Sequence, residues 1–178
     1  MFSVHALACA LLATLAVFDL RQRRLPNAIV AAFAVLYFAQ AWIAGVDRTG
    51  LETHVAMGLA TLVLAAALFR FGWLGGGDAK LFGAVFLWSG PAFATTVFFI
   101  VSLIGLMLGL AQMTIGRMQR DRAAAPTHGW LAPMRGVPYG VALAAGGVAA
   151  VWLPLVHAHV VSPPHIAAWS LSIPVRLI

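Results

Sequence analysis

The sequence is poor in charged residues and in cysteine. Only 9% of its 178 residues are charged, whereas 62% are hydrophobic. Soluble domains usually carry about 25% charged residues, so this composition excludes an ordinary soluble protein and indicates a polytopic membrane protein. The single cysteine, Cys9, excludes a disulfide framework or a thiolate zinc site built from this chain alone.

Acidic residues are also scarce, because five Asp and Glu stand against eleven Lys and Arg. The formal charge of +6 does not indicate nucleic-acid binding, since the basic residues collect in short loops instead of forming a surface stripe. That distribution is typical of the charges that orient membrane spans. We therefore expect membrane lipids around the chain and no nucleic-acid partner.

Long apolar runs define the expected spans. A helix needs about 20 residues to cross roughly 30 Å of hydrocarbon. Runs of that kind lie at about 2–19, 28–46, 54–74, 92–115 and 137–160. A shorter run at about 79–90 is interpreted as a sixth span, with a re-entrant helix as the alternative. The sequence thus predicts an all-α polytopic membrane protein of about six transmembrane helices, in one integral membrane domain over residues 1–178.

The basic residues predict the orientation of these spans. With six crossings, nine of the eleven Lys and Arg fall on one side: Arg21, Arg23, Arg24, Arg70, Lys80, Arg117, Arg120, Arg122 and Arg135. Only Arg48 and Arg176 fall on the other side. Lys and Arg accumulate in cytoplasmic loops, so we expect the N- and C-termini outside. The first run is interpreted as a retained span, because no basic segment precedes it.

Two aspartates stand out because each lies at a span boundary. A carboxylate at hydrocarbon depth costs several kcal/mol unless it is paired or hydrated. The first span ends at Asp19 and the third ends just before Asp78, so the parity of the crossings brings both to the same membrane face. The glycines of "GGGD" (75–78) allow close backbone approach. The pattern predicts a pair of carboxylates.

Such a pair is the equipment of an aspartic protease. Two carboxyl groups about 3 Å apart share one proton. The ionised member activates a water, and the protonated member donates to the scissile carbonyl oxygen. The chain contains neither an HExxH zinc motif nor a GxSxG nucleophile elbow, and we expect no metal and no cofactor. The alternatives are a proton-coupled transporter component, since buried carboxylates also carry protons, and a non-catalytic membrane factor for secretion or pilus assembly.

Helix polarity predicts unequal roles for the two aspartates. Asp19 ends a helix, where the negative end of the macrodipole disfavours a further negative charge, whereas Asp78 begins one. Lys80 adds positive charge on the side of Asp78. The shared proton is therefore expected mainly on Asp19, which leaves Asp78 as the base.

Three segments resemble motifs of the type IV prepilin peptidases, which are intramembrane aspartic proteases of the Gly-x-Gly-Asp class. They are "DLRQRRLPN" (19–27), "GGGDAKL" (75–81) and "VPYGVALAAG" (137–146). The resemblance implies that Asp19 and Asp78 are the catalytic pair. Flanking residues are expected to shape the site or contact the substrate: Arg21, Pro26, Asn27, Gly75, Gly76, Gly77, Lys80, Pro138, Tyr139 and Gly140. For Lys80 the alternative is a contact with lipid headgroups, for Arg21 a topogenic role, and for Tyr139 a position at the membrane interface.

The resemblance also implies a substrate and a location. Members of the family cleave a short basic leader from pilin precursors at the cytoplasmic face of the bacterial inner membrane. Larger members carry a cysteine-paired, zinc-binding insertion and methylate the new N-terminus. This sequence has no CxxC pair and resembles the short form that serves tight-adherence (Flp-type) pili. The implied partner is a pilin precursor, and the resemblance does not extend to methyltransferase activity.

Overall fold

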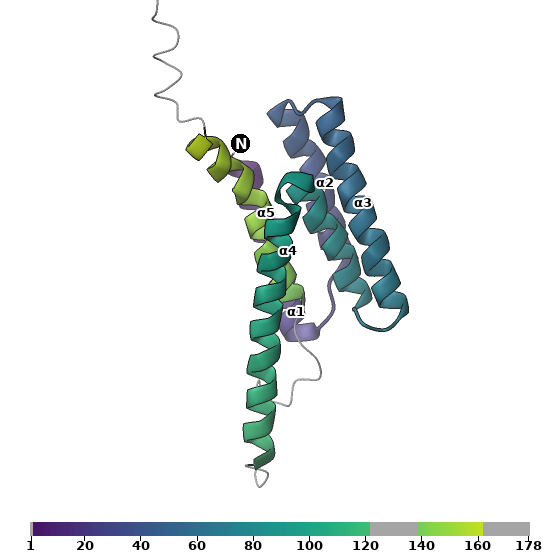
Figure 1. Ribbon diagram of the computed structural model, residues 1–178, viewed down its shortest axis with the longest axis vertical. Coiled ribbons are helices and arrows are strands. Elements are labelled where there is room, and N and C mark those ends of the chain that lie inside the picture. Colours follow the sequence, from purple (N-terminus) through teal and green to yellow (C-terminus); the bar gives the residue numbers. More distant parts are fainter. Residues whose placement is uncertain (1, 122–138, 162–178) are drawn as a thin grey trace, which may run out of the picture.

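The structure, a computed structural model, describes residues 2–121 and 139–161. These residues form five helical elements and no strand: α1 (Phe2–Gln22), α2 (Asn27–Ala44), α3 (Arg48–Arg70), α4 (Gly76–Asp121) and α5 (Tyr139–Val161). The elements pack side by side in one bundle (Figure 1). Each of the five contains a stretch long and apolar enough to cross a membrane. The predicted class, an all-α polytopic membrane protein, is confirmed.

The long element α4 consists of two helices that meet at Gly90. This glycine has φ 56° and ψ −176°, and Pro91 follows it, so the helical hydrogen bonds cannot continue. The first part of α4, residues 76–89, runs back along α3, and the second part, residues 91–121, returns beside α5 (Figure 1). Residues 2–121 and 139–161 thus traverse the bundle six times, with the short run at 79–90 as a traverse of its own.

The first part of α4 is the centre of the bundle. Every residue from 81 to 90 is buried. Because this helix ends inside the protein, its last carbonyl groups need protein partners. His54 of α3 donates from Nδ1 to the Leu87 carbonyl at 2.9 Å, and Ser89 Oγ donates to the Phe86 carbonyl at 3.2 Å. Because these hydrogen bonds satisfy the carbonyl groups at its end, the helix of residues 76–89 can end inside the protein although it is too short to span the hydrocarbon.

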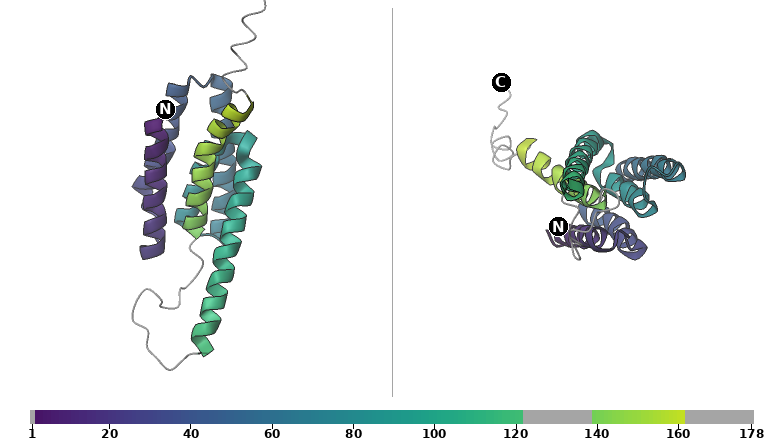
Figure 2. Two further views of the ribbon diagram at one scale, coloured as in Figure 1. Left: turned by 90° about the vertical axis from the view of Figure 1, so that its left-hand side faces the viewer. Right: turned by 90° about the horizontal axis from the view of Figure 1, so that it is seen from below.

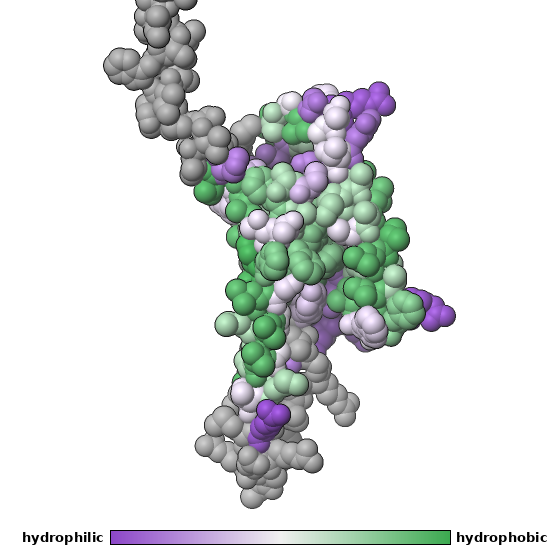
Figure 3. Space-filling view, viewed as in Figure 1, coloured by the Kyte–Doolittle hydropathy of each residue, from purple (hydrophilic) through white to green (hydrophobic). Residues whose placement is uncertain are grey.

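The outer surface of the bundle is apolar. Large hydrophobic side chains are widely exposed on α2, α3 and α4, such as Val35, Val63 and Phe99. Figure 3 shows hydrophobic residues gathered over the middle of the molecule, with hydrophilic residues towards its ends, as over the connection between α2 and α3. This is the surface that a bilayer requires of a multi-pass protein.

One predicted boundary is wrong. The apolar run at about 92–115 predicts a span that ends near residue 115, but the helix of α4 continues to Asp121 and extends past the other helices (Figure 2). From residue 91 to 121 a helix is about 46 Å long, which exceeds the roughly 30 Å of hydrocarbon. The helix therefore emerges from the membrane before it ends. Residues 122–138 and the residues after 161 lie outside the described part of the chain.

Candidate active site

The structure brings Asp19 and Asp78 together at one end of the bundle. Asp19 lies in the last turn of α1 and Asp78 in the first turn of α4. Both line one cavity of about 350 Å³, and they are close enough for the charge of Asp19 to act on Asp78. The remaining walls come from the α1–α2 connection and from the start of α4: Arg23, Arg24, Leu25, Asn27, Gly75, Gly76 and Gly77.

Asp19 is held by the N-terminus of α5. Its side chain is buried, with an exposed fraction of 6%. Oδ2 accepts a hydrogen bond from the backbone N–H of Val141 at 3.2 Å, and the backbone of Gly140 is a second partner. A Cβ at Gly140 would lie 2.7 Å from Cγ of Asp19, so only glycine lets the two backbones approach this closely.

This contact changes the prediction from helix polarity. Asp19 does end its own helix, but it also faces the first N–H groups of α5, where orphan donors and the positive dipole end favour a carboxylate. Asp78 lies in the first turn of α4. Both aspartates therefore meet a helix N-terminus, and polarity no longer assigns the shared proton to Asp19.

Asp78 folds back over the glycine run. A Cβ at Gly75 would lie 2.7 Å from Oδ2 of Asp78, and the Gly75 carbonyl accepts the first helical hydrogen bond, from Ala79 at 2.9 Å. The next two glycines pack against neighbours, Gly76 against the Phe69 ring and Gly77 against Leu25. None of the three has a positive φ. The run thus serves close approach and not an unusual backbone conformation.

Lys80 does not line the cavity of the aspartates. Its Nζ donates to Oδ1 of Asn27 at 2.9 Å, and Asn27 does line that cavity. Any influence of Lys80 on the two carboxylates therefore passes through Asn27 or across space. Pro26 caps α2, and its carbonyl accepts the N–H groups of Ile29 and Val30.

Sequence reasoning singled out Arg21, but the cavity is lined by Arg23 and Arg24. Arg21 is exposed in the last turn of α1. Arg23 directly follows α1 and has φ 52°, a left-handed conformation usually taken by glycine at this position. Its charge acts on Asp19. Arg21 and Arg23 belong to the same "DLRQRRLPN" motif, and within this motif the structure places Arg23, not Arg21, at the cavity.

The last predicted segment contributes through the start of α5. Tyr139 is half-buried and packs on Gly105 of α4, close enough to Asp78 for the charge of that carboxylate to act on it. Pro138 lies outside the described residues. Within residues 2–121 and 139–161, no three His, Cys, Asp or Glu side chains come together as a metal site.

Comparisons with known proteins place the chain in a family. Residues 6–110, which include both aspartates, match the model of the type IV leader peptidase family. The prepilin leader peptidase/N-methyltransferase of Bacillus subtilis (strain 168) is 32% identical over 143 residues, which are 79% of this chain and 52% of that protein. The chain therefore spans about half the length of this curated relative. No solved structure matches. The chain belongs to the type IV leader peptidase family.

Proposed function

We propose that the protein is an intramembrane aspartic endopeptidase that removes the short basic leader from type IV pilin-like precursors of the Flp type. We place the reaction at the cytoplasmic face of the bacterial inner membrane. The observation that carries the proposal is the shared cavity of Asp19 and Asp78, in a chain of the type IV leader peptidase family. The basic residues around that end of the bundle, among them Arg70 and Arg117, support the cytoplasmic placement.

The proposed reaction needs only the two carboxyl groups and a water. With one proton shared between Asp19 and Asp78, the ionised carboxylate takes a proton from the water as its oxygen attacks the scissile carbonyl carbon. The other carboxyl group donates its proton to the carbonyl oxygen. When the tetrahedral intermediate collapses, the C–N bond breaks and one carboxyl group of the pair gives its proton to the leaving nitrogen. The other carboxylate takes a proton from one hydroxyl of the intermediate, and the oxygen of that hydroxyl becomes the carbonyl oxygen of the new C-terminus. Both carboxyl groups then return to the starting state.

The surroundings of the pair suit this reaction. The N–H groups at the start of α5 fix Asp19 in place, which reduces the reorganisation needed as charge moves. Asp78 is half-buried at the cavity wall and is the more accessible of the two to a substrate. The glycines beside both aspartates keep the walls thin enough for an extended peptide to reach them.

Cleavage by the purified protein tests this function. The protein in detergent is incubated with a synthetic Flp-type pilin precursor, and leader loss is followed by mass spectrometry. Asp19→Asn and Asp78→Asn should each lose nearly all activity. Asp47→Asn is the matched control, because Asp47 caps α3 at the other end of the bundle by accepting from Gly50 N–H, and asparagine caps equally well. Cleavage that survives in either dyad variant would overturn the mechanism, and an inactive wild-type protein would overturn the function.

A further inference from the structure

A second cavity, of about 400 Å³, opens between α2 and α3 on the outside of the bundle. We call it the α2–α3 groove. Its α2 wall includes Ala31 and Ala34, its α3 wall includes Leu59 and Leu62, and its floor is the first part of α4. Apart from Asn27 and Lys80 at one end, every residue that lines it is apolar.

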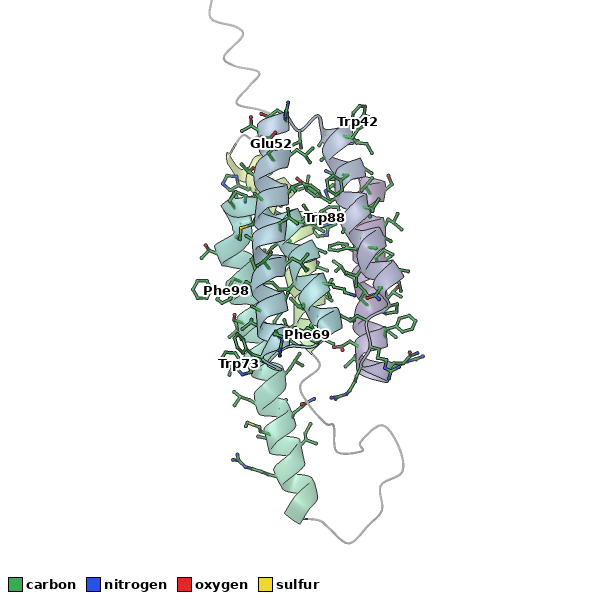
Figure 4. The ribbon with its side chains drawn as sticks, turned by 90° about the vertical axis from the view of Figure 1, so that its right-hand side faces the viewer. Trp42, Glu52, Phe69, Trp73, Trp88 and Phe98 are labelled. Atoms are coloured by element: carbon green, nitrogen blue, oxygen red, sulfur yellow. The ribbon has the colours of Figure 1, made fainter. Side chains whose placement is uncertain are left out.

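The groove exists because α2 and α3 both pack on α4 and scarcely touch each other. In Figure 4 the two helices stand on either side of the first part of α4, with Trp88 between them. The floor includes the small residues Gly83 and Ala84, and Gly83 lies against Leu62 of α3. Small residues at hydrocarbon depth let a further helix approach closely. Ala31 and Leu59 are exposed, so the groove opens towards lipid.

The groove leads to the candidate active site. Asn27 lines both the groove and the cavity of the two aspartates. Lys80 lines the groove and donates to Asn27 at 2.9 Å. From Asn27 to Phe38 the groove follows α2 for about 17 Å, which is about three helical turns. A chain lying in it would thus reach the aspartates at its polar end.

We propose that the α2–α3 groove binds the apolar helical segment of the membrane-embedded precursor, and that the adjoining peptide passes Asn27 to reach Asp19 and Asp78. The proposal rests on the proposed function. A polypeptide at hydrocarbon depth must satisfy its backbone internally and is therefore helical, so its apolar side chains can enter the groove from one helix face. We assign the groove to the substrate and not to a lipid chain because the groove and the cavity of the two aspartates share Asn27 in their walls.

Asn27 and Lys80 explain how the segment changes conformation at this point. The peptide must leave the helix before its scissile bond is accessible, and the backbone groups that it frees need hydrogen-bond partners. The amide N–H₂ of Asn27 and the ammonium of Lys80 are donors placed where the groove meets the cavity. We assign Asn27 and Lys80 as positioning residues, which donate hydrogen bonds to the freed carbonyl groups of the peptide.

The groove is tested by filling it. Ala31→Trp puts a large side chain into the groove. Ala32→Trp is the matched control, because Ala32 is also exposed on α2 but does not line the groove. Cleavage is measured on a full precursor and on a short soluble peptide that spans the cleavage site without the apolar segment. We expect Ala31→Trp to raise KM for the full precursor about tenfold or more, with short-peptide cleavage unchanged, and Ala32→Trp to change neither.

A binding measurement separates this proposal from the function on which it rests. A photoreactive benzophenone side chain at position 31, in an Asp78→Asn background, should cross-link to the full precursor, and the same group at position 32 should not. Equal cross-linking at both positions, cross-linking to lipid alone, or an Ala31→Trp effect that is the same for both substrates would overturn the docking site. An unreactive wild-type protein would instead overturn the peptidase activity, whichever way the cross-linking falls.

Discussion

At the residue scale, each aspartate of the candidate site is matched by a glycine. Gly140 lies against Asp19 and Gly75 against Asp78, and at both a Cβ would lie 2.7 Å from an atom of the carboxyl group. The two glycines act on different kinds of neighbour. Asp19 is buried and bonded to α5, so it cannot yield easily, whereas the half-buried Asp78 carboxylate can swing away.

The freedom of the Asp78 carboxylate to move predicts different outcomes for alanine substitutions at Gly75, which contacts it, and at Gly76, which does not. Gly75→Ala should lower kcat at least tenfold with little loss of stability, because the Asp78 carboxylate moves out of its place to admit the methyl group. Gly76→Ala should have a much smaller effect, because the new methyl group meets only the exposed Phe69 ring, at 3.2 Å, and the ring can rotate. Steady-state cleavage and thermal unfolding in detergent measure the two quantities. Equal losses of kcat would show that the run acts as a flexible linker.

Some of these residues could be predicted from the sequence, and others could not. Asp19, Asp78 and the glycines follow from the cost of charge at a membrane boundary and from the motif they share. Nothing in the sequence favours Arg23 over Arg21, because the left-handed conformation of Arg23, with φ 52°, does not follow from its residue type. Leu25, buried against Gly77, had no signal beyond being apolar.

At the scale of elements, α5 is the main addition of the structure to the site. Helix polarity was considered only for the helices that carry the aspartates, and α5 begins more than a hundred residues after Asp19 in the chain. No local sequence pattern predicts that an N–H group at the start of α5 donates a hydrogen bond to Asp19. The resemblance of 137–146 to a family motif marked the segment but gave no physical role for it. The contact supplies that role.

The role of α5 predicts the effect of removing one backbone donor. Val141→Pro removes the N–H that bonds Asp19, and proline is tolerated in the first turn of a helix. We expect a loss of kcat of at least tenfold, consistent with a charge-assisted hydrogen bond worth about 1.5 kcal/mol or more. Val141→Ala keeps the N–H and is the control for the lost side chain; it should stay within about threefold of wild type. If both variants lose activity equally, packing and not the hydrogen bond explains the effect.

The turn at Gly90 predicts a second effect at this scale. Its φ of 56° with ψ of −176° is a conformation that is open almost only to glycine, and a Cβ there would overlap the His54 ring. Gly90→Ala should lower the free energy of unfolding by about 2 kcal/mol or more. Gly45→Ala is the control, because Gly45 also has a positive φ but nothing within 4 Å, and it should cost about 1 kcal/mol. Denaturant titration in micelles compares them, and equal losses would mean that the His54 contact imposes no constraint.

At the scale of the whole molecule, the six traverses could be predicted from the sequence, but not how deeply each lies in the bundle. Hydropathy and the parity of the crossings place both aspartates at one end of the bundle, and the structure has them there. The central position of the first part of α4 was not evident, since a short apolar run fits a buried helix and a short span equally well. Nor was the α2–α3 groove, because it depends on two helices that share a neighbour and not on any residue pattern.

The side of the membrane on which the aspartates lie is the remaining prediction at this scale. Arg48 and Glu52 form an ion pair at the start of α3, next to the α2–α3 connection, at the opposite end of the bundle from Asp19 and Asp78. This connection carries few basic residues, whereas the connections beside the aspartates carry many, so positive-inside asymmetry puts the aspartates at the cytoplasm. Alkaline phosphatase, which is active only outside the cytoplasm, should be inactive when fused within 116–134 and active when fused within 47–53. The reverse pattern would move the aspartates to the outer face and exclude cleavage on the cytoplasmic side, while leaving the pairing of Asp19 with Asp78 intact.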